Sequence, residues 1–248
     1  MVFVQDSGSS AIFNSCTLTK NSATDYGGVA VVQSSGSAIF TSCTLTKNSA
    51  TFSGGVVRVQ SSGSAIFTSC ILTENTGKHG GVAYVINSGS AAFNSCNLTK
   101  NSATLEGGVA VVQESGSSAT FTTCTLTENT ASQYGGVAIV QSSGSAAFTS
   151  CTLTKNSAII TGGVALVQSS GSAIFTSCNL TKNSAANDGG VALVQTSGSA
   201  TFNSCVLTEN TAKDGGVASV RNSGSVTVSS AAIFTDCSLT KNSATDVS

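Results

Sequence analysis

Proline and tryptophan are absent from this sequence, and charged residues make up only 8% of its 248 residues. So few charges leave little basis for long-range electrostatic recognition. The net charge is −1, and Arg58 and Arg221 are the two arginines. Nucleic acid requires a basic stripe that displaces counterions from phosphate, so we expect no nucleic-acid partner. An anionic membrane surface is disfavoured for the same reason.

Long apolar runs are missing as well. No stretch reaches the ~18 consecutive apolar residues of a membrane helix, so we expect no membrane insertion. Residues 1–5 lack the basic start and the apolar stretch of a signal peptide. Export would therefore depend on a segment outside this sequence, and otherwise the protein stays inside the cell.

The residues that enzymes need are scarce. The single histidine, His79, leaves no nucleophile and base pair and is interpreted as a solvated turn residue. Acidic residues such as Asp25, Glu106, Asp188 and Asp214 occupy different places in the pattern described below and build no acidic cluster. Paired short Cys/His spacings and the calcium-binding nonapeptide are absent. We therefore expect no enzyme, no metal site and no cofactor.

What the sequence does contain is one unit repeated nine times. Each copy carries one cysteine, with phenylalanine three residues before it, leucine two after and asparagine five after. The cysteines are Cys16, Cys43, Cys70, Cys96, Cys124, Cys151, Cys178, Cys205 and Cys237. The repeats span approximately 1–26, 27–53, 54–79, 80–106, 107–134, 135–161, 162–188, 189–214 and 215–248. Units of this size cannot bury their own apolar face, so they are expected to stack into one domain covering residues 1–248.

The unit at residues 27–50 indicates how it folds. Its β-branched residues alternate with polar ones, and Gly-Gly and Ser-Gly-Ser mark corners, which indicates short strands and excludes helix. We assign an inward orientation to Ala30, Val32, Ala38 and Phe40. A bend between Phe40 and Cys43 then lets Cys43 face inward as well. The fold class predicted is all-β: a single-stranded parallel β-helix, or β-solenoid, with nine coils and three short strands per coil. Equivalent residues would then lie about 4.8 Å apart along a rod.

Two columns of this rod would be unusual inside an apolar core. A recurring asparagine would be costly if unpaired, but stacked amides can bond from coil to coil. This predicted ladder consists of Asn21, Asn48, Asn75, Asn101, Asn129, Asn156, Asn183, Asn210 and Asn242. The cysteines could form a strained column of disulfides, but we favour reduced thiols that act as small apolar fillers.

A resemblance to a known family follows from these motifs. Leu18-Thr19-Lys20-Asn21, followed by Gly27-Gly28-Val29-Ala30, resembles the FxxN and GGAI repeats of chlamydial polymorphic outer-membrane proteins. The resemblance covers all nine units, although leucine replaces the phenylalanine of FxxN. It implies a right-handed parallel β-helix and does not indicate an export route.

The Thr-Leu-Thr motif suggests one candidate surface. Its threonines point outward about 6.7 Å apart along each strand. This arrangement resembles the Thr-x-Thr arrays of insect ice-binding solenoids, although the first column contains other residues in several coils. A solvated structural face is the simpler interpretation. The candidate Thr face consists of Thr17, Thr19, Thr44, Thr46, Thr73, Thr99, Thr125, Thr127, Thr152, Thr154, Thr181, Thr208 and Thr240.

A second candidate surface is apolar. Strand alternation from Ala30 and Val32 assigns the neighbouring residues outward, and contiguous exposed apolar surface usually marks a partner. The alternative is that this assignment is inverted and the residues are core. The candidate apolar contact face consists of Val29, Val31, Val56, Val82, Tyr84, Val109, Val111, Val137, Ile139, Val164, Leu166, Val191, Leu193 and Val217.

Both ends of the sequence fall in mid-pattern. The sequence is therefore either an excerpt of a longer array or a subunit that stacks end to end. An extra stretch, Val226-Thr227-Val228-Ser229-Ser230, is interpreted as a partial cap or a turn that tolerated insertion. The role expected is a structural or adhesive rod of an extracellular surface or filament. Its expected partners are further copies of itself, end to end or laterally, or other surface proteins; ice binding is the alternative.

Overall fold

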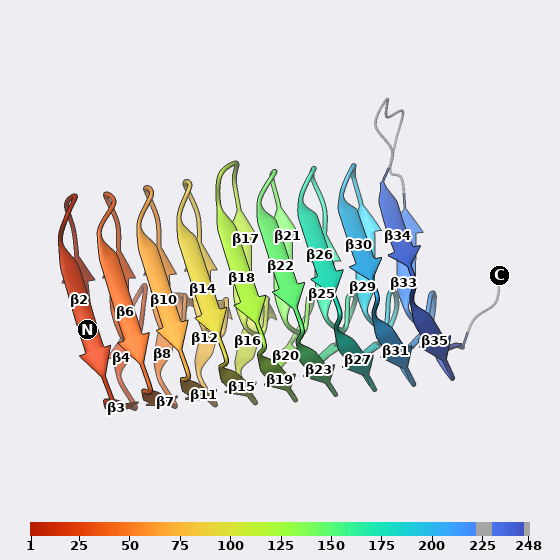
Figure 1. Ribbon diagram of the computed structural model, residues 1–248, viewed down its shortest axis with the longest axis horizontal. Coiled ribbons are helices and arrows are strands. Elements are labelled where there is room, and N and C mark those ends of the chain that lie inside the picture. Colours follow the sequence, from red (N-terminus) through yellow and green to blue (C-terminus); the bar gives the residue numbers. More distant parts are fainter. Residues whose placement is uncertain (222–229, 246–248) are drawn as a thin grey trace.

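The computed structural model describes residues 1–221 and 230–245 and shows a rod of four parallel β-sheets (Figure 1). Each sheet contains nine described strands, and each coil contributes one strand to every sheet. All pairings between successive coils are parallel and place equivalent residues opposite each other, as Phe67 lies opposite Phe40. The predicted β-solenoid class is therefore present.

The four sheets follow the chain in the order A, B, C and D. Sheet A contains β1 (Val2–Val4), β5 (Ala30–Val32), β9 (Val57–Val59), β13 (Ala83–Val85), β17 (Ala110–Gln113), β21 (Ala138–Gln141), β25 (Ala165–Val167), β29 (Ala192–Gln195) and β33 (Ala218–Arg221). Sheet B contains β2 (Ser10–Asn14), β6 (Ser37–Thr41), β10 (Ser64–Thr68), β14 (Ser90–Asn94), β18 (Ser118–Thr122), β22 (Ser145–Thr149), β26 (Ser172–Thr176), β30 (Ser199–Asn203) and β34 (Ala231–Thr235).

Sheets C and D are built from shorter strands. Sheet C contains β3 (Thr17–Thr19), β7 (Thr44–Thr46), β11 (Ile71–Thr73), β15 (Asn97–Thr99), β19 (Thr125–Thr127), β23 (Thr152–Thr154), β27 (Asn179–Thr181), β31 (Val206–Thr208) and β35 (Ser238–Thr240). Sheet D contains β4 (Ser22–Ala23), β8 (Ser49–Ser53), β12 (Thr76–His79), β16 (Ser102–Glu106), β20 (Thr130–Ala131), β24 (Ser157–Ala158), β28 (Ser184–Ala185), β32 (Thr211–Ala212) and β36 (Ser243–Ala244).

The prediction of three strands per coil is wrong: sheet D adds a fourth strand to each coil. Most strands of this sheet contain two residues, as β4 does, and two residues cannot display the alternation on which the prediction relied. They are recognisable only because the coil above supplies hydrogen-bond partners. The Val226–Ser230 insertion lies, up to residue 229, outside the described residues.

Each corner of the coil has its own turn chemistry. Between sheets A and B, the amide of Gly36 donates to the carbonyl oxygen of Gln33 at 2.9 Å, and the two residues between them have positive φ values. This is the geometry of a type I′ turn. A single left-handed residue, such as Ser42 with φ 53°, makes the corner between sheets B and C, and Lys47 with φ 56° makes the next corner.

Glycine is required at the corner between sheets D and A. Gly135 has φ 62°, and a Cβ added to Gly136 would lie 2.2 Å from the carbonyl oxygen of Gly163 in the next coil. Real Cβ atoms do not approach backbone atoms so closely. Gly-Gly at this corner therefore lets successive coils approach at the spacing of the sheets.

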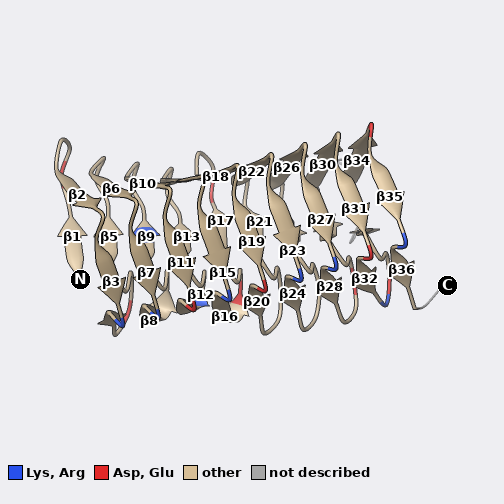
Figure 2. Cartoon of the chain, turned by 60° about the horizontal axis from the view of Figure 1, so that its bottom comes forward, with Lys and Arg blue, Asp and Glu red and all other residues tan. Residues whose placement is uncertain are grey.

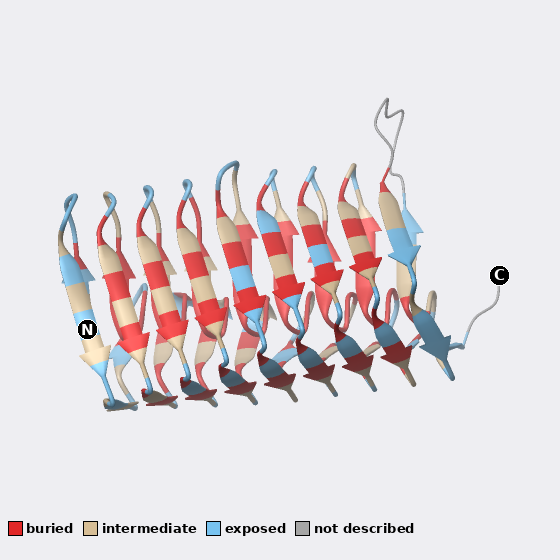
Figure 3. Cartoon of the chain, in the orientation of Figure 1, coloured by how far each residue is buried: buried red, intermediate tan, exposed pale blue. Residues whose placement is uncertain are grey.

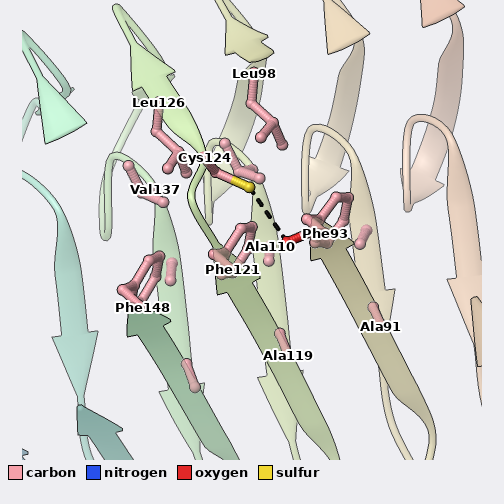
Figure 4. Close-up of a cluster of buried hydrophobic side chains, with 14 of the residues drawn as sticks. Ala91, Phe93, Leu98, Ala110, Ala119, Phe121, Cys124, Leu126, Val137 and Phe148 are labelled. Atoms are coloured by element: carbon pink, nitrogen blue, oxygen red, sulfur yellow. Dashed lines mark hydrogen bonds between the residues drawn. The ribbon is translucent and has the colours of Figure 1, made fainter. Parts of the chain in front are cut away.

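The core consists of axial columns of like residues (Figures 3 and 4). The phenylalanine rings of sheet B stack face to face, as between Phe93 and Phe121, whose centroids lie 4.8 Å apart with planes 4° from parallel. Leu98 and Leu126 form the equivalent column of sheet C. Burial alternates along sheet B, which gives the banded strands of Figure 3. The stacking of like residues thus fixes the register of the whole rod.

Candidate functional surfaces

The asparagine column forms the predicted ladder. At Asn129, the side-chain oxygen accepts bonds from the backbone amide and the side-chain amide of Asn101, at 3.0 and 3.1 Å. The Nδ2 of Asn129 donates to the carbonyl oxygen of Leu98 and to the Oδ1 of Asn156. Asn129 is fully buried. The ladder is confirmed, and its role is to satisfy the backbone where the chain turns from sheet C to sheet D.

The cysteine column is a second ladder, made of thiols. All nine cysteines are free, and the seven from Cys43 to Cys205 are buried. The Sγ of Cys124 donates to the carbonyl oxygen of Phe93 at 3.2 Å (Figure 4) and to that of Thr122 at 3.4 Å. The interaction with the neighbouring Cys151 thiol, together with burial, raises the pKa of Cys124. A raised pKa keeps this thiol protonated at neutral pH.

The candidate Thr face lies on the outer side of sheet C. In β19, Thr125 and Thr127 flank the buried Leu126 and point away from the core. The second column, which begins at Thr19, contains threonine in all nine strands, whereas the first column includes Ile71, Asn97, Asn179, Val206 and Ser238. Figure 2 turns this sheet toward the viewer.

Two coils of the Thr face differ from the others in how their hydroxyls bond. The Oγ1 of Thr99 donates to the Oδ1 of Asn97 at 2.5 Å, and Thr181 makes the same bond to Asn179 at 2.6 Å. These hydroxyls are engaged within their own strand. The outer surface of sheet C is therefore regular in its backbone and irregular in its chemistry.

The expectation of an exposed apolar face is wrong for the column that begins at Val29. Val29, Val56, Val82, Val109, Val137, Val164, Val191 and Val217 are all buried in the main core. The reason is a bulge at the corner: the amides of Val29 and Ala30 both donate to the carbonyl oxygen of Val56, at 2.8 and 3.0 Å. A bulge interrupts strand alternation, so two successive residues can both face the core.

The neighbouring column points outward from sheet A, but much of it is covered. Val31, Val111, Ile139, Leu166 and Leu193 are all buried. The last four form a small second core, with Tyr84 and Tyr134 packed against it. The segment after sheet D, meaning the residues between its strand and the Gly-Gly corner such as 132–134, folds over this face and places Tyr134 against it. Alternation along one strand could not reveal this cover. The predicted apolar contact surface is therefore an inner layer along much of sheet A.

Beside this covered column runs a row of glutamines. Their amides bond from coil to coil, with Nε2 to Oε1 distances of 2.8 Å from Gln168 to Gln141 and 2.8 Å from Gln195 to Gln168. Gln60 bonds to Gln33 in the same way at 2.6 Å. This row and the segment after sheet D border two cavities of about 510 and 460 Å³.

The larger cavity lies over the first coils and adjoins an aromatic cluster that the sequence analysis did not identify. Arg58 lies over the ring of Tyr26, with its guanidinium carbon 3.9 Å from the ring centroid, and 5.4 Å from that of Tyr84. Phe52 contacts the rings of Tyr26 and His79 at centroid distances of 5.7 and 5.4 Å. Burial raises the pKa of Tyr84. Departures from the repeat at these positions were the signal in the sequence.

His79 is not the solvated turn residue that the sequence suggested. Its Nδ1 lies 2.8 Å from the Oε1 of Glu106, and 17% of its side chain is exposed. Strand β12 is extended to four residues in this coil and brings the ring against Phe52. The pair of His79 and Glu106 closes one side of the aromatic cluster.

The corner between sheets C and D carries a row of charged residues, which Figure 2 shows along one edge of the rod. Lys47 pairs with Glu74 at 3.5 Å, and Lys182 pairs with Glu209 at the same distance. Both pairs are solvent-exposed, and such pairs contribute at most about 1 kcal/mol each. This edge is interpreted as a solvated one.

Residues 1–221 and 230–245 contain neither a metal cluster nor a membrane-spanning helix. In this part of the chain, no three histidine, cysteine or acidic residues lie close enough together to hold a metal ion. The same residues form no helix with the length and apolar character needed to cross a membrane.

Comparison with known proteins places the fold. A family model described as a right-handed β-helix region matches residues 80–247. No curated protein and no solved structure matches the chain. The family match supports the right-handed coil implied by the FxxN and GGAI motifs and does not extend to the chlamydial proteins themselves.

Proposed function

Because the chain belongs to the right-handed β-helix family, we propose that it is a non-enzymatic structural and adhesive rod whose coils continue onto a second copy. The observation that carries this proposal is the exposure of core residues in the last described coil. Phe234 is 38% and Leu239 is 50% exposed, whereas their counterparts one coil earlier, Phe202 and Leu207, are fully buried. Contiguous exposed core residues favour burial by another coil.

The two ends of the rod are complementary in their hydrogen bonding. Inside the chain, every buried asparagine oxygen accepts from the coil before it, as the oxygen of Asn48 accepts from Asn21. At the first coil, Asn21 presents an oxygen to which no described residue donates. At the last coil, the backbone amide of Asn242 has the place that donates to the next asparagine in the other coils. A second copy stacked head to tail would repeat the bonds made between successive coils.

The extracellular or cell-surface setting is part of this proposal. It is supported by the resemblance of the repeats to those of chlamydial polymorphic outer-membrane proteins and by the broad, weakly charged faces, which suit lateral contact with other surface proteins. Sheet B contributes the longest regular strands to these faces.

Head-to-tail assembly is tested by sedimentation velocity and negative-stain microscopy over a hundredfold range of concentration. We expect rods whose length grows with concentration at constant width. The variant Phe234→Asp places a charge on the exposed coil end and should abolish growth. Ile233→Asp, one residue earlier and 49% exposed on the outer side, is the matched control and should not. Persistent monomers of the unmodified chain, or equal growth in both variants, would refute the proposal.

Ice binding is the second candidate, and the uniform column of nine threonines on sheet C favours it. A repeating array of hydroxyl and methyl groups is the chemistry that such a surface requires. The internal bonds at Thr99 and Thr181 oppose it, because an interrupted array presents a less regular template. A thermal hysteresis assay separates the two candidates. Ice binding would be supported if the unmodified chain shapes ice crystals and halts their growth while Thr127→Lys does not. Unshaped ice crystals at millimolar concentration of the unmodified protein would exclude it.

A further inference from the structure

The aromatic residues outside the core column gather on one face of the rod. Of the 11 phenylalanines and three tyrosines, nine phenylalanines belong to the stacked core column. Of the remaining five aromatic residues, two lie in strands of sheet A, one in strand β8 of sheet D, and two in the segment after sheet D that folds over sheet A. They are Phe3, Tyr26, Phe52, Tyr84 and Tyr134.

One cation has replaced an apolar residue in the same place. Arg58 pairs in register with Val31 on one side and with Tyr84 on the other, and this column is otherwise mainly Val, Ile and Leu. Figure 2 shows it as the blue segment of β9. A repeat array builds its scaffold from residues that recur, so a cation that occurs once in a largely apolar column calls for a separate explanation.

The guanidinium of Arg58 is held in position but is not neutralised. Its Nε donates to the Oε1 of Gln60 at 2.8 Å, and one terminal nitrogen donates to the Oγ of Ser53 at 3.4 Å. Arginine has five N–H groups, so three remain available. Among the residues that the structure describes, no carboxylate forms an ion pair with it. A half-buried, oriented guanidinium is the group that proteins use to bind carboxylates.

The cavity beside Arg58 supplies the rest of a binding site. It has a volume of about 510 Å³ and is lined by Phe3, Tyr26 and Val31 on its apolar side and by the amides of Gln33 and Gln60 on its polar side. Phe3 is 54% exposed, so its ring is available to a ligand. Small-molecule sites are typically apolar cavities of this size with a few fixed polar groups.

We propose that this cavity binds a small molecule with an apolar ring and one carboxylate, in which the carboxylate contacts Arg58 and the ring packs against Phe3 and Tyr26. The exposed Asp25 also lines the cavity, and its charge affects the affinity for the ligand. Its negative charge opposes an anionic ligand, so its removal should strengthen binding. The cavity includes Phe3 of the first coil, onto which a second copy would stack, so binding is measured at concentrations where the rod is monomeric.

Isothermal titration calorimetry of the full chain tests the proposal with 3-phenylpropionate as the probe. We expect one saturable site, with binding at least tenfold weaker for 3-phenylpropanol, which lacks the charge, and for acetate, which lacks the ring. Arg58→Val introduces the residue found at Val31 and should fold normally while reducing the affinity at least tenfold. Asp25→Asn should increase the affinity about twofold.

The control is Arg221→Gln, which removes a guanidinium from the same sheet outside this cavity and introduces the residue found at Gln195. It should leave binding unchanged. The absence of saturable binding at millimolar probe, equal binding of the alcohol, or an unchanged affinity in Arg58→Val would overturn the proposal. Thermal melting of each variant establishes that the rod is intact.

Discussion

The thiol of Cys124 and the amide of Asn129 have equivalent places at two successive corners of one coil. The Sγ of Cys124 donates to the carbonyl oxygen of Phe93 at 3.2 Å, and the Nδ2 of Asn129 donates to the carbonyl oxygen of Leu98 at 2.9 Å; each acceptor lies 31 residues earlier. Both corners contain one left-handed residue, Thr123 with φ 55° and Glu128 with φ 56°. The same turn is thus satisfied twice, once by a weak donor and once by a strong one.

Asn129→Ala should destabilise the rod strongly. The change removes the acceptor of the Asn101 backbone amide and a donor to the carbonyl of Leu98, both in a buried corner. A buried group left without its partner costs about 1–3 kcal/mol, so we expect a loss of about 3 kcal/mol in the free energy of unfolding. Urea denaturation followed by circular dichroism measures it.

The matched control for this ladder variant is Asn97→Ala, an exposed asparagine of the preceding coil. Its loss should change the free energy of unfolding by no more than about 0.5 kcal/mol. Equal effects of the two substitutions would contradict the structural role assigned to the ladder.

The buried thiols should resist alkylation because the folded rod excludes the reagent, including at Cys151, whose pKa is lowered by its interactions with the Cys124 and Cys178 thiols. The pKa of Cys124 and of Cys178 is raised, through interaction with the Cys151 thiol and through burial. The thiolate is the reactive form, so a raised pKa lowers the reactive fraction at any given pH. With iodoacetamide at pH 8, mass spectrometry should show Cys16 and Cys237 modified first, since only these two are partly exposed. In denaturant all nine should react, and equally rapid labelling without denaturant would contradict the buried column.

Gly136→Ala should prevent normal stacking of its coil. The added methyl group would lie 2.2 Å from the carbonyl oxygen of Gly163 and 2.6 Å from that of Ser157. Because these are backbone atoms, relief requires two coils to separate, and we expect a loss of more than about 3 kcal/mol. Gly8→Ala is the comparison, since a Cβ there meets nothing within 4 Å and its positive φ costs about 1 kcal/mol. Thermal unfolding of both variants would show whether the Gly-Gly corner sets the coil spacing.

The sequence was sufficient to predict the features that depend on recurrence. The period, the inward columns and the ladder of Asn129 and its equivalents all follow from one requirement, that identical residues lie over one another. Column chemistry is visible in a sequence because each column repeats the same choice nine times. The parallel pairing confirms this reading, as at Phe40 and Phe67.

Features that depend on local geometry or on contacts between faces were not predictable. The bulge at Val29 and Ala30 reverses the alternation, and no residue type announces it. The fourth sheet was not predicted because a strand of two residues, such as Ser22–Ala23, shows no periodicity in the sequence. The cavity beside Arg58 was not predicted because it lies between the outer side of sheet A and the segment after sheet D. Only the folded coil brings these two parts together.

The most direct test of the stacked coil is the distance between labels on one outward column. Ile12, Ile174 and Ile233 are exposed members of the same column of sheet B. Ile174 lies six coils after Ile12, and Ile233 lies eight coils after it. Spin labels can be attached to unnatural amino acids introduced at two of these positions at a time. The distance between the two labels is then measured by double electron–electron resonance. At about 4.8 Å per coil, the distances from position 12 should be roughly 29 and 38 Å, in narrow distributions. Distances that do not increase linearly with the number of intervening coils would contradict the account.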